Sequence, residues 1–170
     1  DDVHVSHANY GAFIQGSQVQ LDVTRDNLVT TLNTFNAIEM VKAWLFGNSY
    51  LWNGQLDTLI SRDVFWEESM HGIFPENTGV FPEAFESLET FLDYLMKTAL
   101  FTRTSAASTF YFEPIQAMDY FNHDEIPAFD LLGNEFVLMP SPYDFEAHRS
   151  YQYQNLTTRG TVEFRSTCAQ

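Results

Sequence analysis

A chain of 170 residues is long enough for one domain, and its 45% apolar share, with 16 Phe, 8 Tyr and 3 Trp, predicts a sizeable core. The formal net charge is −15, and the chain has only eight Lys and Arg residues to neutralise phosphates. Both numbers argue against nucleic acid and anionic membrane surfaces as partners. The single cysteine, Cys168, excludes an intrachain disulfide and favours a reducing compartment, the cytoplasm. The longest apolar runs are too short to span a membrane.

Residues 17–23 alternate between apolar and polar side chains, which predicts a β-strand. Gln18, Gln20 and Asp22 share one face of that strand. This polar stripe either faces solvent or forms a floor that hydrogen-bonds a polar ligand.

Two helices are predicted from apolar residues at helical spacing, over residues 25–46 and 82–101. Thr24 and Gly47 are the expected N-cap and stop of the first. The expected buried stripes are Leu28, Leu32, Phe35, Ile38, Val41 and Leu45 in the first helix, and Phe85, Leu88, Leu92, Leu95 and Ala99 in the second.

Arg62 lies in a polar interruption, residues 61–63, directly before Phe65 and Trp66. An arginine in such a setting is either a surface residue that packs its aliphatic stem or a ligand contact. The residues alone leave both interpretations open.

The region from residue 109 to residue 148 predicts a short strand and two short helices. The strand covers residues 109–113, and a helix beginning at Pro114 includes Met118 and Phe121. His123 is expected on the surface, and Ser141-Pro142 begins the last helix. On that helix, Asp144 and His148 are four residues apart, either as a surface pair or as a pair of metal ligands.

Residues 159–165 predict the most informative strand, because it carries charge on one face. Val162 and Phe164 make an apolar face, and Glu163 and Arg165 lie on the other, about 7 Å apart. A carboxylate suits Mg²⁺, and an arginine suits phosphate or a substrate carboxylate. The alternative is an exposed ion pair.

These elements predict an α+β fold in a single domain, residues 1–170. Strands near the two ends of the chain are expected to pair in one antiparallel sheet, with helices packed on one side. Since the chain begins at Asp1 and ends shortly after the last strand, we expect it to be part of a longer protein.

Four stretches occur in an order and spacing that one family shares. The first, Ser-Gln-Val-Gln-Leu-Asp at residues 17–22, is similar to that family's Thr-Gln-Val-Asn-Leu-Asp strand. The others are residues 45–49 followed by Ser61-Arg62, residues 78–82 followed by 91–95, and residues 144–148 followed by Glu163-Phe164-Arg165. In these stretches the chain resembles the C-terminal part of the glutamate–cysteine ligase family.

The resemblance implies a fold like that of glutamine synthetase, of which this chain would be an incomplete half. It also implies an ATP- and Mg²⁺-dependent ligase. In the implied reaction, the glutamate γ-carboxylate attacks the γ-phosphate of ATP, and the amine of cysteine then displaces phosphate from the acyl phosphate. Most of the family's metal-binding glutamates lie in its N-terminal half, so that half would be the missing partner and this chain would be inactive alone.

The resemblance also implies roles for individual residues. Glu163 would be a Mg²⁺ ligand, Arg165 would contact the phosphoryl group, and Arg62 would clamp a substrate carboxylate. Cofactor-binding residues at the nucleotide or metal end would be Gln18, Gln20 and, as an extra phosphate contact, Arg159.

The chain departs from the family pattern at Tyr50, Phe145 and residues 166–167, and residues 102–130 match nothing in it. Three alternatives stay open. The chain could belong to a related ligase with another amine acceptor, or to a non-catalytic, anion-binding scaffold domain of the same fold. It could also be a plain acidic structural domain.

Overall fold

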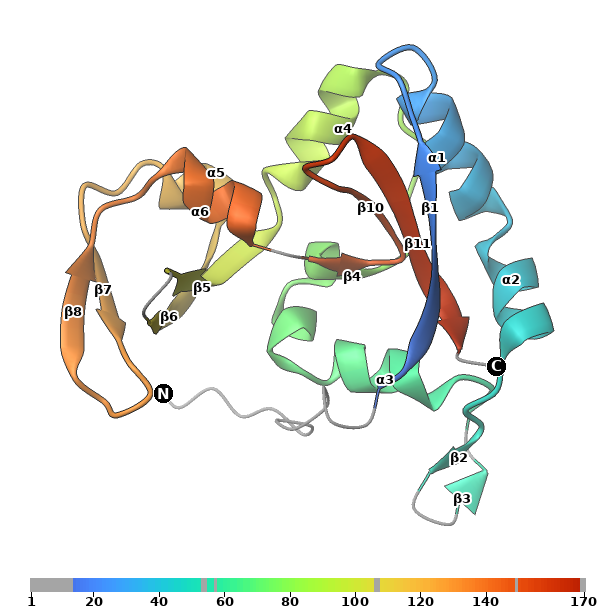
Figure 1. Cartoon of the computed structure of the whole chain (residues 1–170), viewed down its shortest axis with the longest axis horizontal. Helices are drawn as coiled ribbons and strands as arrows, with labels where there is room; N and C mark the ends of the chain where they lie inside the picture. Colours follow the sequence, from blue (N-terminus) through green and yellow to red (C-terminus); the bar gives the residue numbers. More distant parts are fainter. Residues whose placement is uncertain (1–13, 53–54, 57, 106–107, 149, 169–170) are drawn as a thin grey trace. The chain divides into compact units, whose positions relative to one another are not determined.

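A computed structural model describes residues 14–168 except 53–54, 57, 106–107 and 149 (Figure 1). The chain forms two compact units, one of residues 1–91 and 151–170 and the other of residues 92–150. Antiparallel sheets combined with helices confirm the α+β class. None of the described helices is long and apolar enough to cross a membrane. A single domain over residues 1–170 stays a prediction.

The first unit is built on a three-stranded sheet in the order β1-β11-β10 (Figure 1). Its strands are β1 (Gly16–Asp22), β10 (Gln154–Leu156) and β11 (Thr161–Cys168), and both pairings are antiparallel. The predicted pairing of strands from the two ends of the chain is therefore confirmed.

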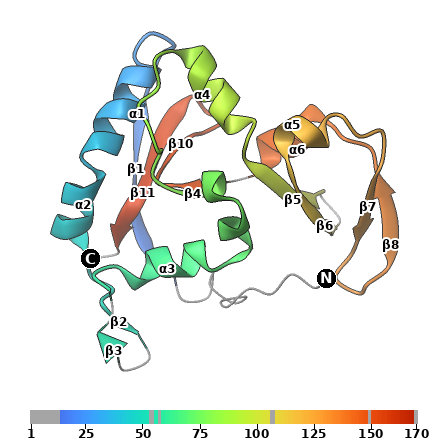
Figure 2. The same cartoon turned by 180° about the vertical axis from the view of Figure 1, so that it is seen from behind.

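The helices α1 (Leu28–Ala37) and α2 (Glu39–Phe46) lie along one face of this sheet (Figure 2). The Phe35 ring packs 4.0 Å from the Phe164 ring, centroid to centroid. This arrangement confirms that helices cover the apolar face of β11.

The prediction of a single helix over residues 25–46 is wrong, because the helix is interrupted at Ile38, which ends α1 and precedes α2. The first helix also begins later than expected, with Asn27 rather than Thr24 at its N-cap. The break turns α2 so that Glu39 is buried, whereas Val41 and Leu45 are 53% and 62% exposed. Glu39 accepts a 2.6 Å hydrogen bond from Gln154 and forms an ion pair with Lys42. A charged group, not the predicted apolar stripe, therefore faces the sheet from α2.

The strand predicted over residues 17–23 is present as β1, one residue earlier at each end, but its side chains are exposed on both faces, with Val19 and Leu21 at 55% and 37%. It is an edge strand of the sheet that the described residues form. The rest of this unit consists of short elements: β2 (Leu51–Trp52), β3 (Gln55–Leu56), α3 (Ser61–Glu67), the 3₁₀ helices η2 (Met70–Ile73) and η3 (Pro75–Asn77), β4 (Thr78–Gly79) and β9 (Tyr151–Gln152).

The second unit contains a four-stranded antiparallel sheet in the order β5-β6-β7-β8 (Figure 2). Its elements are β5 (Ala99–Thr104), β6 (Thr109–Gln116), α5 (Ala117–Tyr120), β7 (Ile126–Phe129), β8 (Glu135–Leu138) and α6 (Pro142–Ala147). Its core is a cluster of buried side chains: Leu100, Phe112, Ala117, Tyr120, Ile126, Ala128 and Leu138.

The helix predicted over residues 82–101 is wrong at both ends, because α4 covers only Leu88–Leu95. Ala99 and Leu100 instead pair with β6, so the end of the predicted helix belongs to β5. The helix predicted at Pro114 is also wrong. Pro114 lies inside β6, in the interruption of the β5–β6 register, where its missing N–H breaks no ladder bond.

The helix predicted after Ser141 is confirmed as α6, with Ser141 and Asp144 forming a capping box. Asp144 and His148 do not form a surface pair. Asp144 is 2% exposed, and His148 ends the helix with an extended backbone and lies edge-on to Phe101. His123 is exposed, as predicted.

Candidate functional site

β11 places its charged residues on the face opposite Val162 and Phe164, as the alternation predicts. Glu163 and Arg165 are only 2% and 6% exposed, so the alternative of an exposed ion pair is wrong. The Arg165 Nε donates to the Glu163 Oε1 over 2.6 Å. The sheet therefore buries a charged pair on the face opposite its apolar face.

Gln20 and Arg159 extend this pair into a chain of hydrogen bonds across the sheet. Gln20 lies opposite Glu163 in the β1–β11 register and donates its Nε2–H to the Glu163 Oε2 over 2.9 Å. The Arg159 Nη2 donates to the Gln20 Oε1 over 2.9 Å. The chain Arg159–Gln20–Glu163–Arg165 thus runs from an exposed arginine to a buried one.

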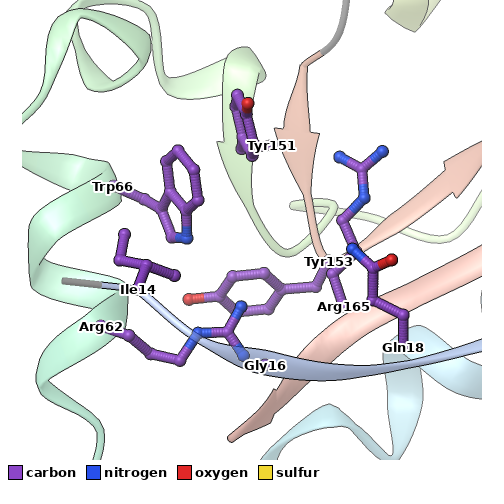
Figure 3. A pocket seen from close by; sticks show the side chains of 8 residues that line it. All are labelled: Ile14, Gly16, Gln18, Arg62, Trp66, Tyr151, Tyr153 and Arg165. Atoms are coloured by element: carbon purple, nitrogen blue, oxygen red, sulfur yellow. The ribbon is translucent and has the colours of Figure 1, made fainter. Parts of the chain in front are cut away.

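Arg165, the buried end of this chain of hydrogen bonds, lines a pocket of about 170 Å³ in the first unit (Figure 3). Three predicted site residues line it, Gln18 from β1, Arg62 from α3 and Arg165 from β11. The remaining lining residues are Ile14, Gly16, Trp66, Tyr151 and Tyr153.

Arg62 lies in the first turn of α3 and is 6% exposed. Its Nη1 donates to the Thr167 carbonyl over 2.7 Å, and its Nε has no hydrogen-bond partner among the described residues. Gly16 permits this close approach, because a Cβ on Gly16 would lie 2.8 Å from the Arg62 Nη1. Arg62 is therefore a pocket residue, not a surface residue.

Aromatic rings form the remaining wall of the pocket. The Trp66 and Tyr151 rings stack with centroids 3.7 Å apart, and the Arg165 Cζ lies 5.6 Å from the centroid of the Tyr151 ring. The sequence interpretation missed Trp66, Tyr151 and Tyr153. Trp66 follows Arg62 by one helical turn, a spacing that could have placed it on the same side of α3.

Beside the pocket, Asp63 accepts a hydrogen bond from the Tyr153 hydroxyl. Burial raises the pKa of Asp63 to about 6, although this hydrogen bond and the Arg62 charge oppose the shift. Burial and the nearby Asp63 charge raise the pKa of Tyr153 well above its usual value. The Tyr153 hydroxyl thus stays protonated and donates to Asp63 at neutral pH.

A Mg²⁺ site at Glu163 does not fit the described residues. Both Glu163 oxygens accept hydrogen bonds, one from Arg165 and one from Gln20. Among the residues that the structure describes, no group of three or more His, Cys, Asp or Glu side chains could hold a metal ion. Mg²⁺ needs near-octahedral coordination by several oxygens, so Glu163 alone does not provide a site.

The structure brings the predicted site residues together but groups them differently from the resemblance. Arg62 and Arg165, assigned to different substrate groups, line the same pocket. Gln18 joins them there, while Gln20, Glu163 and Arg159 lie along the adjoining hydrogen-bond chain. In comparisons with family models, curated proteins and solved structures, nothing matches this chain.

Proposed function

We propose that this chain is the C-terminal part of an ATP-dependent carboxylate–amine ligase resembling glutamate–cysteine ligase, and that its pocket binds a substrate carboxylate. The observation that carries the proposal is the convergence of two buried guanidinium groups, Arg62 from α3 and Arg165 from β11, on one pocket.

The chemistry of these groups selects an anion. A guanidinium has only donors and binds a planar carboxylate through paired hydrogen bonds. Arg165 already has a carboxylate partner in Glu163, whereas Arg62 holds a neutral carbonyl and keeps a buried Nε without a partner among the described residues. A ligand carboxylate that reaches Arg62 would complete its hydrogen bonding and offset the buried positive charge.

The size of the pocket favours a small ligand. At about 170 Å³ it is smaller than the 300–1,000 Å³ that is usual for drug-sized ligands. It suits an amino-acid carboxylate such as that of glutamate, and it is too small to enclose a nucleotide. The proposal therefore assigns the carboxylate substrate to this pocket, and ATP and Mg²⁺ to residues outside those described.

An exposed apolar surface supports the proposal that the first unit works together with another part of the same protein. Val19 and Leu21 on the edge strand β1 are exposed, and Met40, Trp44 and Leu45 on α2 are 82%, 73% and 62% exposed. Exposed apolar surface of this kind usually marks an interaction site. The N-terminal half that the resemblance implies would cover it in the cytoplasmic enzyme, and the chain alone would be inactive.

The direct test is phosphate release from Mg²⁺–ATP with glutamate and each amino acid in turn as acceptor. It should be run on this chain and on any longer protein that contains it. Release by the longer protein, stimulated by cysteine, would support the glutamate–cysteine ligase, and stimulation by another amine would support a related ligase. No turnover with any acceptor would contradict the ligase proposal.

A non-catalytic, anion-binding scaffold is the second candidate. It is favoured by the engagement of both Glu163 oxygens and by the absence of a metal-binding group among the described residues. Glutamate binding without ATP turnover by the longer protein would select the scaffold, and loss of that binding on Arg62→Ala would place the ligand in the pocket.

A further inference from the structure

We infer that Glu163 is a positioning residue for Arg165 rather than a metal ligand, and that Gln20 and Arg159 fix the orientation in which it works. The inference rests on the proposed function only where it treats the pocket as a carboxylate site. Its physical content is the chain Arg159–Gln20–Glu163–Arg165, in which each donor has one defined acceptor.

The first step concerns the Gln20 amide, whose two ends differ only in hydrogen bonding. The Arg159 guanidinium can only donate hydrogen bonds, so the end of the Gln20 amide that faces its Nη2 must be the oxygen. The Thr161 hydroxyl also lies 3.4 Å from this oxygen. The Gln20 NH₂ group is thereby directed at Glu163.

The second step concerns Glu163. An ionised carboxylate only accepts hydrogen bonds, and here one oxygen takes the Gln20 Nε2–H and the other takes the Arg165 Nε–H. The side chain is 2% exposed, so water does not replace either donor readily. Glu163 is held on both sides by donors, which is the arrangement of a group that orients an arginine.

The third step concerns Arg165. Its Nε edge is taken by Glu163, and its guanidinium lines the pocket beside Tyr151 (Figure 3). Glu163 and Arg165 project from the same face of one strand. The hydrogen bond from Arg165 to Glu163 therefore fixes the orientation of the guanidinium before any ligand binds. Such preorganisation lowers the entropy cost of binding a carboxylate.

This chain of donors and acceptors predicts a specific rescue. In Glu163→Gln, the new NH₂ group faces the Gln20 NH₂ group, and the buried Arg165 loses its charged partner. Adding Gln20→Glu restores every hydrogen bond. The carboxylate introduced at position 20 would accept from both Arg159 and the new amide at position 163, whose oxygen would still accept from Arg165. The swap also keeps the total charge of the chain. If Glu163 were instead a metal ligand, a carboxylate at position 20, on another strand, would not restore metal binding.

The experiment measures the folding equilibrium constant of the chain from urea unfolding, together with the NMR signal of the Arg165 Nε–H. We expect Glu163→Gln to lower the folding constant about 10- to 100-fold and to shift the Nε–H signal. The double variant Gln20→Glu/Glu163→Gln should recover more than half of that loss on a logarithmic scale and return the signal. The matched control, Gln15→Glu/Glu163→Gln, has the same composition but places the carboxylate at an exposed position just before β1 that does not line the pocket, and it should not recover.

Three results would overturn the inference. The first is a swap variant no more stable than Glu163→Gln. The second is an Arg165 Nε–H signal that Glu163→Gln leaves in place. The third is Mg²⁺ binding by the unmodified chain that is lost equally in Glu163→Gln and in the swap. If Glu163→Gln does not fold, a folded swap variant supports the inference and an unfolded one overturns it. Because none of these measurements uses glutamate or ATP, a failure of the proposed function is seen separately, as an unmodified chain that does not bind glutamate.

Discussion

Two buried charged residues, Asp144 in the second unit and Arg62 in the first, differ in how completely protein groups bind them. In the second unit, Asp144 accepts hydrogen bonds from the Tyr120 hydroxyl and the Ser141 N–H, both over 2.9 Å, and forms an ion pair with Arg103. In the first unit, Arg62 keeps an Nε without a partner among the described residues and lines a pocket. The closed network holds a turn and a helix together, and the open one retains hydrogen-bonding capacity for a ligand.

The difference shows that a buried charge is not by itself a sign of function. Asp144 was a candidate metal ligand from its spacing to His148, yet its Oδ2 accepts two hydrogen bonds and its Oδ1 lies 2.9 Å from the Arg103 Nε. The residues around Arg62 left open whether it is a surface residue or a ligand contact, yet it borders a cavity. What separates them is that Asp144 forms an ion pair with Arg103, whereas the Arg62 Nε borders a pocket and has no hydrogen-bond partner among the described residues.

Breaking the closed network should have the largest effect on stability. Asp144→Ala leaves Arg103 without its charge partner and the buried Tyr120 hydroxyl without its acceptor, so we expect a loss of about 3–5 kcal/mol in unfolding free energy. Urea unfolding, followed by hydrogen exchange of the β6 amides, measures it. Asp119→Ala, at an exposed aspartate of the same unit, is the control. A loss below about 1 kcal/mol would contradict a structural role for the network.

The pH dependence of the second unit should come next in size. Burial lowers the pKa of His148 from 6.5 to about 4, so the folded state favours the neutral ring. Between these values the unfolded chain binds more protons, and stability is therefore lost as the pH falls from about 6.5 to about 4, by up to about 3 kcal/mol. Hydrogen exchange in β6 across this range should show the loss, and His148→Leu should remove it. Replacing the exposed His123 by Gln should leave it in place, and a slope unchanged by His148→Leu would exclude His148 as its source.

The first unit should respond to the same pH range with the opposite sign. Burial raises the pKa of Asp63 from 3.8 to about 6, so the folded state binds the extra proton there. The stability of this unit should therefore fall as the pH rises from about 4 to about 6, by somewhat less than the His148 effect.

Tryptophan fluorescence reports this unit alone, because Trp44, Trp52 and Trp66 all belong to it. Asp63→Asn keeps an acceptor for Tyr153 and should abolish the slope. Glu67→Gln, at an exposed carboxylate of the same helix, should not. If the stability of both units changed with pH in the same direction, the predicted opposite effects of Asp63 and His148 would be contradicted.

The sequence was most reliable where one local pattern decides the structure. The alternation in β11 correctly placed Glu163 and Arg165 on one face, and Ser141-Pro142 correctly began α6. Pairing between the end strands then brought Gln20 opposite Glu163. The sequence therefore predicted Gln18, Arg62 and Arg165 in the pocket lining, but it predicted neither the aromatic residues there nor which residues bond to one another.

The errors arose where distant parts of the chain decide the structure. Ala99 and Leu100 fit a helical pattern, but pairing with β6 makes them a strand. Nothing local indicates that the chain breaks at Ile38 and turns Glu39 toward Gln154. Similarly, Tyr151 reaches the pocket through parallel pairing of β9 with β4, which lies far away in the sequence.

The smallest effect on stability should come from Gly16→Ala, which tests how the open network is held. The added Cβ would lie 2.8 Å from the Arg62 Nη1 and 3.0 Å from the Thr167 carbonyl oxygen, so the flexible end of Arg62 has to move. A strand residue with a side chain loses less chain entropy on folding than glycine, and this gain should keep the net change within about 1 kcal/mol.

Glutamate binding should nevertheless weaken about ten-fold, since a displaced guanidinium loses its alignment with the carboxylate. The decisive comparison is Gly16→Ala made in an Arg62→Ala background, where the methyl group has no guanidinium to displace and should change neither stability nor residual binding. Ser17→Ala, one residue along the same exposed strand, controls for a general effect on β1. If Gly16→Ala weakens binding equally with and without Arg62, then Gly16 acts through the strand, and the pocket does not depend on the close approach of Arg62 to β1.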